Sequence, residues 1–240
     1  MMKSISILIP VYNEEESLQT LFEELKTSFE NNQSIEIIFI NDGSSDMSQK
    51  VIENEIANHS TWKLINLYRN YGKSVALQSG IDIASNELIA TLDGDLQDDP
   101  KELINLVREL NEDDVIVGWK KDRLDPLEKK IASKIFNFFI KLFSGLKIKD
   151  SNSGIKVLKK EVAKSLNLYG GRHRYIPLLA HQKGFNVKEI PVNHRERKFG
   201  KSKYGAERYK HGFFDFMTIL FLGKYMDRPL HFFGMVGFLS

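Results

Sequence analysis

The first 120 residues alternate short apolar runs with amphipathic stretches of helical spacing, and this alternation restricts the fold more than any other feature. The apolar runs predict strands at Ile5 to Ile9, Ile35 to Ile40, Leu64 to Leu67, Leu88 to Leu92 and Val115 to Val117. Strands separated by helices form a mostly parallel sheet that helices cover on both faces. The pattern predicts an α/β fold, and 240 residues suffice for one full core.

Polar clusters follow four of the predicted strands. They are Pro10 to Glu14, Asn41 to Asp46, Arg69 to Lys73 and Asp93 to Pro100. Because ligands bind beyond the carboxyl ends of the strands in such sheets, four clusters on one edge indicate a binding site. Both Gly72-Lys73-Ser74 and Gly200-Lys201-Ser202 lack the preceding glycine of a phosphate loop, and the turn after the first strand lacks the GxGxxG of a dinucleotide fold.

The cluster after the fourth strand, DGDLQDDP, places Asp93, Asp95 and Gln97 on alternate positions. Two carboxylates this close stay ionised when a cation lies between them, and oxygen ligands suit Mg2+ or Mn2+ with a polyphosphate completing the shell. An EF-hand loop is excluded because Asp98 stands where it needs glycine. The alternative is a solvated acidic turn that caps a helix beginning at Pro100.

For the cluster after the second strand, a purely structural role explains the residues as well as a role in binding does. Asn41 to Ser44 has good turn chemistry, and Asp46 is a good helix cap. Asp42 is therefore either a turn residue or a member of the site.

The charge is divided unevenly along the chain. Residues 1–119 carry 8 Lys and Arg against 22 Asp and Glu, and residues 120–240 carry 26 against 10. A half this basic needs an anionic partner: nucleic acid, anionic lipid headgroups or a phosphorylated substrate. The chain has no Cys, which excludes thiolate metal sites, and no charged-then-apolar leader precedes Ile5, so we expect a cytosolic location for most of it.

Taken in order, PVYNE, NDGSSD, RNYGK with ALQSG, and DGDLQDDP resemble the family 2 glycosyltransferases of the GT-A fold. The resemblance is greatest to their polyprenyl-phosphate branch, which includes dolichyl-phosphate mannose synthases and undecaprenyl-phosphate glucosyltransferases. Asp150 to Lys156 and Arg197 to Tyr204 extend it over nearly the whole chain. It implies a metal-dependent, inverting enzyme that moves one sugar from a nucleoside diphosphate sugar to polyprenyl phosphate, with Mg2+ or Mn2+ as cofactor.

The resemblance also implies roles for individual residues. The donor nucleotide would be held by Pro10, Tyr12, Glu14, Asp42 and Asp93, and a segment closing over its phosphates would contribute Arg197, Ser202 and Lys203. The metal ligands would be Asp93, Asp95 and Gln97, and the catalytic residues Asp95 and Asp150. The lipid phosphate would be gripped by Lys120, Lys129 and Ser133. In this family Arg is usual at the positions of Lys120 and Lys129. Lys retains the positive charge but cannot form the two parallel hydrogen bonds of a guanidinium.

The chemistry of such a transfer agrees with this charge distribution. A phosphate monoester is mostly dianionic at pH 7, so it attacks the anomeric carbon without a protein base. Positive charge is then needed to hold it beside the donor diphosphate. Asp150 would orient the site or accept a sugar hydroxyl, and a strand-entry turn explains it equally well.

Three segments predict contact with a membrane. Leu127 to Leu146 has apolar residues at spacings of three, four and seven with lysines among them, which predicts a basic amphipathic helix, the alternative being a core helix. Gly212 to Gly223 is apolar apart from Asp215 and too short to span a bilayer. Pro229 to Ser240 carries no formal charge and predicts the start of an interrupted transmembrane segment.

These expectations divide the chain into a catalytic domain at 1–228 and the start of that segment at 229–240. Within the domain, 1–119 forms the donor and metal half, and 120–228 the acceptor and membrane-interface half. We expect peripheral attachment at the cytoplasmic membrane face, integral if the natural chain continues, and no nucleic-acid partner. Association of copies into a homo-oligomer stays open.

Several alternatives stay open at this point. UDP-glucose is the expected donor and GDP-mannose the next. A family 2 enzyme with a saccharide or protein acceptor would favour a less basic sequence between Lys120 and Lys149. A sugar nucleotidyltransferase should show a Gly-rich, Arg-bearing loop after the first strand, where PVYNE stands. A non-enzymatic binder of nucleic acid or anionic lipid would leave DGDLQ unexplained.

Overall fold

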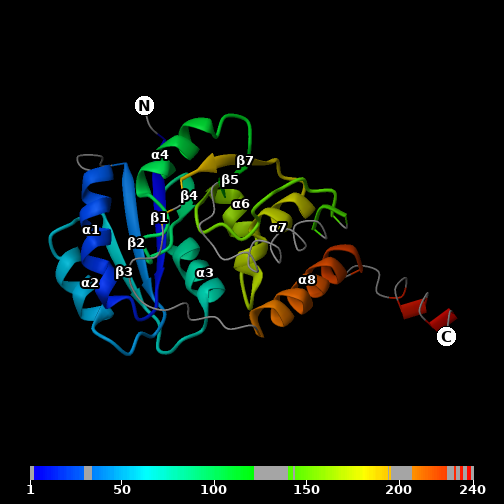
Figure 1. Cartoon of the computed structure of the whole chain (residues 1–240), viewed down its shortest axis with the longest axis horizontal. Helices are drawn as coiled ribbons and strands as arrows, with labels where there is room; N and C mark the ends of the chain where they lie inside the picture. Colours follow the sequence, from blue (N-terminus) through cyan, green and yellow to red (C-terminus); the bar gives the residue numbers. More distant parts are fainter. Residues whose placement is uncertain are drawn as a thin grey trace.

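A computed structural model describes residues 3–29, 34–121, 140–142, 144–193, 195, 207–225, 230, 233–234 and 237–238. Its described part forms one sheet of seven strands in the order β3-β2-β1-β4-β6-β5-β7 (Figure 1). The strands are β1 Ile5–Val11, β2 Ile35–Asn41, β3 Trp62–Asn66, β4 Leu88–Thr91, β5 Val115–Lys120, β6 Lys156–Lys159 and β7 Val187–Val192. β6 is antiparallel to both of its neighbours, β4 and β5, and all other pairs are parallel. The predicted mostly parallel α/β sheet is confirmed.

Helices cover both faces of the sheet (Figure 1). They are α1 Glu15–Phe29, α2 Ser48–Ile56, α3 Lys73–Ile83, α4 Pro100–Glu109, α6 Lys160–Ser165, the 3-10 helix η1 Arg172–Tyr175, α7 Ile176–Gln182 and α8 Glu207–Tyr225. Successive strand side chains point to opposite faces, so Ile7 packs among α1, α2 and α4, whereas Leu8 packs among α3, α6, α7 and α8. One core therefore lies on each side of the sheet.

The five predicted strands are present, with ends shifted by up to three residues. Sequence analysis did not predict β6 or β7. Both contain charged residues at positions that the fold buries or half-buries, such as Lys156 in β6 and Glu189 in β7. Charged residues interrupt the apolar runs by which strands are recognised, so these two segments gave no strand signal.

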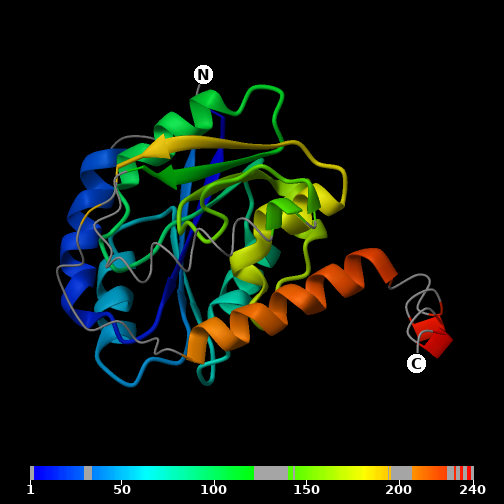
Figure 2. The same ribbon diagram turned by 45° about the vertical axis from the view of Figure 1, so that its right-hand side comes forward.

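The segments predicted to meet a membrane are described only in part. Residues 122–139 and 143 lie outside the described residues, and they include most of the segment Leu127 to Leu146. Gly212 to Gly223 lies in α8, the helix drawn in orange (Figure 2). This helix buries Phe216 and Ile219 in the core and exposes Phe214 and Met217. Among the described residues, no helix combines the length and apolar character needed to cross a bilayer.

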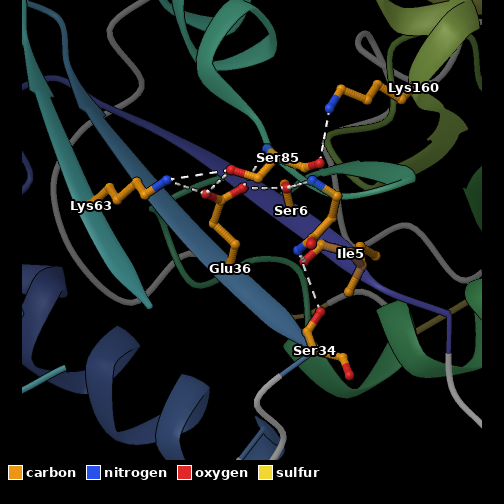
Figure 3. A network of polar contacts seen from close by, with 8 residues as sticks. Ile5, Ser6, Ser34, Glu36, Lys63, Ser85 and Lys160 are labelled. Carbon is orange, nitrogen blue, oxygen red and sulfur yellow. Dashed lines mark hydrogen bonds and ion pairs between the residues drawn. The ribbon is translucent and has the colours of Figure 1, made fainter. Parts of the chain in front are cut away.

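A buried carboxylate joins three strands at the edge where the parallel strands begin. Glu36 of β2 accepts hydrogen bonds from the Ser6 hydroxyl of β1 at 2.5 Å, from Lys63 of β3 at 2.5 Å, and from the backbone N–H and hydroxyl of Ser85 at 2.9 and 3.0 Å (Figure 3). Burial raises the pKa of Glu36, but Lys63, Ser6 and Ser85 together bring it below its ordinary value. These partners offset the cost of removing the charge from water, so the network serves stability.

We expect Glu36→Gln to lower the free energy of unfolding by about 2 kcal/mol at neutral pH, because an amide cannot accept hydrogen bonds on both sides. Since the folded-state pKa is lowered, this contribution is full above the ordinary pKa of 4.5 and is lost as the pH falls through the lowered value. Urea titrations of both proteins at neutral pH and at about pH 3 measure it. Glu53→Gln, at an exposed position, is the control. Equal stabilities at neutral pH would contradict the prediction.

Candidate active site

The loops that follow β2 and β3 are joined by Asp42. This carboxylate is buried, and its two oxygens accept the backbone N–H groups of Tyr71 at 2.7 Å and Gly72 at 2.9 Å. Burial raises the pKa of Asp42, and the two N–H groups partly offset that rise. Gly72 has a φ of +91° at the cap of α3, a conformation that favours glycine. Asp42 therefore fixes the start of α3, whatever else it binds.

Hydrogen bonds in both directions hold the loop after β1 to the segment that follows β2. Asn13 has a φ of +51°, and its side-chain oxygen accepts the Ser45 N–H at 2.8 Å. The backbone N–H of Glu14 donates to the Ser48 hydroxyl at 2.9 Å. Ser17 of α1 then donates to the carbonyl of Gly94 at 2.9 Å. The loop that carries Tyr12 and Glu14, which begins just after Pro10 at the end of β1, is thus fastened to the DGDLQ loop as well.

The DGDLQ loop turns at Leu96, which is buried and has a φ of +62°. Left-handed backbone is uncommon for a bulky residue, and such outliers gather at functional sites. On either side of Leu96, Asp95 and Gln97 are half-buried, and the Asp95 carboxylate accepts the Gln97 N–H at 3.2 Å. Asp99 caps α4 by accepting the Lys101 N–H at 3.0 Å. The predicted helix cap is confirmed, and it coexists with half-buried oxygen ligands earlier in the loop.

Asp93 forms an ion pair with Lys73, the first residue of α3. Burial raises the pKa of Asp93, but Lys73, and more weakly Lys120 and Lys156, lower it to about 2. The carboxylate is therefore ionised at neutral pH, with cations supplied by α3, β5 and β6.

Two further lysines lie beside this pair, Lys156 buried and Lys120 half-buried. Lys156 is 3% exposed and donates to the carbonyl of Ser153. Its burial, with Lys73 nearby, lowers its pKa to about 8 against the opposing effect of the aspartates. Lys120 lies 2.8 Å from a carboxylate oxygen of Asp98, which is 1% exposed. Burial lowers the pKa of Lys120, but Asp98, with Asp93 and Asp150, raises it above its ordinary value.

Gly154 allows the chain that enters β6 to approach these carboxylates. A Cβ atom there would lie 2.6 Å from an oxygen of Asp93 and 2.6 Å from one of Asp98. Its carbonyl accepts the Thr91 hydroxyl of β4 at 2.6 Å. No side chain fits at this position, so a glycine is required for β4 and β6 to enclose the acids.

A histidine completes the polar cluster. The hydroxyl of Ser74 accepts the backbone N–H of His173 at 3.0 Å and lies 2.9 Å from its ring Nδ1. Burial, and then the charges of Lys73 and Arg174, hold the pKa of His173 well below its ordinary value. The ring is therefore neutral at neutral pH, and it links η1 to the first turn of α3.

The family profile described as Glycosyl transferase family 2 matches residues 6–166 of the chain. The chain belongs to glycosyltransferase family 2. This glycosyltransferase is 35% identical over 240 residues to the dodecaprenyl-phosphate galacturonate synthase of Rhizobium johnstonii, with 97% of the chain and 71% of that protein covered. It is 37% identical over 223 residues to the undecaprenyl-phosphate 4-deoxy-4-formamido-L-arabinose transferase of Salmonella typhimurium, with 91% and 68% covered.

Solved structures show the GT-A fold of this glycosyltransferase. The mannosyltransferase PcManGT from Pyrobaculum calidifontis, in complex with GDP-Man and Mn2+, has a TM-score of 0.67 at 14% identity, covering 91% of the chain and 65% of that protein. Glucosyl-3-phosphoglycerate synthase from Mycobacterium tuberculosis, in complex with phosphoglyceric acid, has a TM-score of 0.70 at 15% identity, covering 92% and 80%. At these identities the likeness concerns the fold alone, and it confirms the fold predicted from the sequence.

The structure brings together most of the site residues predicted for the glycosyltransferase. At the loops and strand ends of one sheet edge lie Pro10, Tyr12, Glu14, Asp42, Asp93, Asp95, Gln97, Lys120 and Asp150. Lys129, Ser133, Arg197, Ser202 and Lys203 fall in parts of the chain that the structure does not describe.

Sequence analysis missed three residues of this cluster. Lys73 stood in a recognised polar cluster, where it was considered only for a phosphate loop. Lys156 ended a recognised segment but was given no role, and His173 gave no signal, because their neighbours in the fold, such as Asp93 and Ser74, are distant in sequence.

The residues at this edge fit a divalent cation that also binds a diphosphate. Among the described residues, no three His, Asp or Glu side chains gather closely enough to hold a metal ion by themselves. Asp95 and Gln97 nevertheless offer a carboxylate and an amide oxygen at half-buried positions, beside the ionised Asp93. Mg2+ and Mn2+ prefer oxygen ligands, and Mg2+ commonly takes one or two from carboxylates and others from substrate phosphates.

Proposed function

We propose that this glycosyltransferase transfers one sugar, with inversion, from a nucleoside diphosphate sugar to a polyprenyl phosphate at the cytoplasmic face of a membrane. The observation that carries the proposal is the placement of three lysines, Lys73, Lys120 and Lys156, around the acidic DGDLQ loop. Both reactants are anions, and this edge offers oxygen ligands for a cation beside fixed positive charge. Two relatives that match over nine tenths of the chain carry polyprenyl-phosphate acceptors in their names.

On the donor side, Pro10, Tyr12, Glu14, Asp42 and Asp93 would hold the nucleotide, and Arg197, Ser202 and Lys203 its phosphates. Asp95 and Gln97, with Asp93, would hold Mg2+ or Mn2+, which when bound neutralises the leaving nucleoside diphosphate. Asp42 already fixes the turn before α3, and Leu96 fixes the loop between the two ligands. The donor site is therefore largely formed before substrate arrives, which lowers the cost of organising it.

On the acceptor side, Lys120, Lys129 and Ser133 would hold the lipid phosphate. The Lys120 ammonium lies 2.8 Å from a carboxylate oxygen of Asp98. This ion pair fixes the position of the positive charge, and the lipid phosphate would share the ammonium with Asp98. The phosphate dianion is itself the nucleophile and needs no protein base. Asp150, which is buried and whose backbone N–H donates to Glu189 at 2.8 Å, would orient the sugar or the acceptor.

The membrane-facing part of the proposal is supported by α8. Phe214 and Met217 are exposed on its outer side, whereas Phe216 and Ile219 anchor it to the core. A helix that is fixed by one face and exposes large apolar side chains on the other suits a membrane interface. We propose that 1–228 form the catalytic domain and attach peripherally, and that 229–240 begin a membrane segment.

An assay with Mn2+ or Mg2+, undecaprenyl phosphate and a panel of nucleotide sugars tests the function. We expect a lipid-linked sugar from one donor, with UDP-glucose the first candidate and GDP-mannose the second. Nucleotide-linked galacturonate and 4-deoxy-4-formamido-L-arabinose are included because of the relatives' names. If no donor yields a lipid-linked product while a soluble saccharide is glycosylated, the proposed acceptor is wrong.

A further inference from the structure

Arg195, which no role above uses, contacts the DGDLQ loop and the helices on either side of it. It follows the end of β7 and contacts residues of α1 and of the cap of α4. Its backbone N–H donates to the carbonyl of Gln97 at 3.0 Å. Its guanidinium donates to Glu24 of α1 at 2.7 Å and to Asp99 at 2.5 Å. One residue thus holds the last proposed metal ligand, the cap of α4 and the first helix of the fold.

Both acidic partners depend on this contact. Asp99 uses one carboxylate oxygen to cap α4 and the other to bind Arg195. The second oxygen of Glu24 is buried and has no hydrogen-bond partner within the described part of the chain, so the guanidinium is the charge that compensates it. A planar guanidinium suits such bridging, because its donors form a rigid fork, whereas a lysine presents a single ammonium.

We propose that Arg195 is a positioning residue that sets the Gln97 end of the DGDLQ loop for the divalent cation. The inference rests on the proposed function, because it takes Asp95 and Gln97 as ligands. Leu96 anchors the middle of the loop, and Ser17 anchors its beginning through Gly94. Arg195 supplies a further anchor, at the end where the amide oxygen of Gln97 must be presented. Its guanidinium ties the segment to Glu24 and Asp99, and so keeps its backbone N–H against the Gln97 carbonyl.

The test measures Mn2+ affinity directly, by the electron paramagnetic resonance signal of free Mn2+ titrated with protein in the presence of UDP. We expect Arg195→Ala to weaken Mn2+ binding about tenfold, since outer partners of metal ligands typically contribute factors of 10 to 100. The Mn2+ affinity of Arg195→Lys should lie between those of Arg195→Ala and the unaltered protein. High Mn2+ should restore most of the turnover of Arg195→Ala, a recovery that a purely structural defect would not show.

Lys188→Ala is the matched control. Lys188 also bridges two acids, Glu109 at 3.3 Å and Asp113 at 3.9 Å, but it lies away from the DGDLQ loop, so Mn2+ affinity should not change. If Arg195→Ala does not fold, Asp99→Asn replaces it, because Asn still caps α4 and loses the charge that pairs with Arg195.

Three results decide the inference, and none of them depends on sugar transfer. A tenfold loss of Mn2+ affinity in Arg195→Ala or Asp99→Asn, with unchanged affinity in Lys188→Ala, supports the inference. Equal Mn2+ affinity in all folded variants overturns it, and so does a lack of Mn2+ binding by the unaltered protein. Protein that binds Mn2+ with UDP but glycosylates no lipid phosphate refutes the proposed acceptor while leaving the role of Arg195 intact.

Discussion

Asp95→Asn is expected to lower turnover by about two to three orders of magnitude. The substitution exchanges a carboxylate for an amide at the proposed cation ligand, and stabilisation of the leaving group by about 3 to 4 kcal/mol is lost with it. The side chain is half-buried and accepts the Gln97 N–H at 3.2 Å, and the amide oxygen of Asn can accept the same bond. The free energy of unfolding should therefore change by less than about 1 kcal/mol.

Steady-state turnover at saturating Mn2+, donor and lipid phosphate measures this effect, and thermal unfolding monitors the fold. Asp82→Asn is the control, because Asp82 is an exposed aspartate of α3 whose oxygen accepts the side-chain N–H of Gln78 at 2.9 Å. It loses the same charge without touching the loop, so turnover should stay within about twofold. An Asp95→Asn enzyme as active as this control would disprove the ligand role of Asp95.

Lys120→Ala is expected to be the most destabilising of these substitutions, at about 3 to 5 kcal/mol. It removes the cation that lies 2.8 Å from Asp98, and Asp98 is only 1% exposed. A buried carboxylate left without its partner must either stay charged in a medium of low polarity or take up a proton. Urea unfolding at neutral pH measures the loss. A change below about 1 kcal/mol would show that the pair contributes as little as an exposed one.

The double variant Asp98→Asn/Lys120→Met separates stability from acceptor binding. Removing both charges leaves no unpaired ion, and replacing a buried pair in this way is often neutral, so most of the lost stability should return. If Lys120 also holds the lipid phosphate, the refolded double variant should still show a KM for polyprenyl phosphate raised about tenfold or more, because charge-assisted hydrogen bonds contribute about 1.5 to 3 kcal/mol. A stable double variant with an unchanged KM would assign Lys120 to the fold alone.

The sequence was informative wherever a residue's environment is local. β1, β2 and β4 are buried on both faces, and their predominantly apolar runs identified them, although Ser6 and Glu36 interrupt the first two. The acidic turn before Pro100 could be interpreted as a helix cap because such a cap is local: Asp99 accepts the N–H of Lys101, two residues away. In the same way, the polar clusters were placed on one edge because parallel strands all end there.

Residues whose partners are distant in sequence could not be interpreted in this way. Lys156 lies in a four-residue strand and is buried because Asp93, Asp98 and Asp150 surround it in space. Arg195 looked like one more charge in a basic segment, and only the fold shows that it meets Glu24, 171 positions earlier. The charge network was therefore invisible to sequence analysis, although most of its members lie in recognised motifs.

The reversed direction of β6 bears on how this chain could be divided. β6 lies between β4 and β5, and β5 pairs with β6 on one side and β7 on the other. The acidic and basic halves of the sequence therefore interleave in one sheet, and the change of charge near residue 120 is no boundary of the fold. A fragment ending there would hold β5 without either neighbour and would leave β4 with an unpaired edge, a surface that invites aggregation. The two halves of the sequence must therefore be inherited together, because neither can be exchanged as a module.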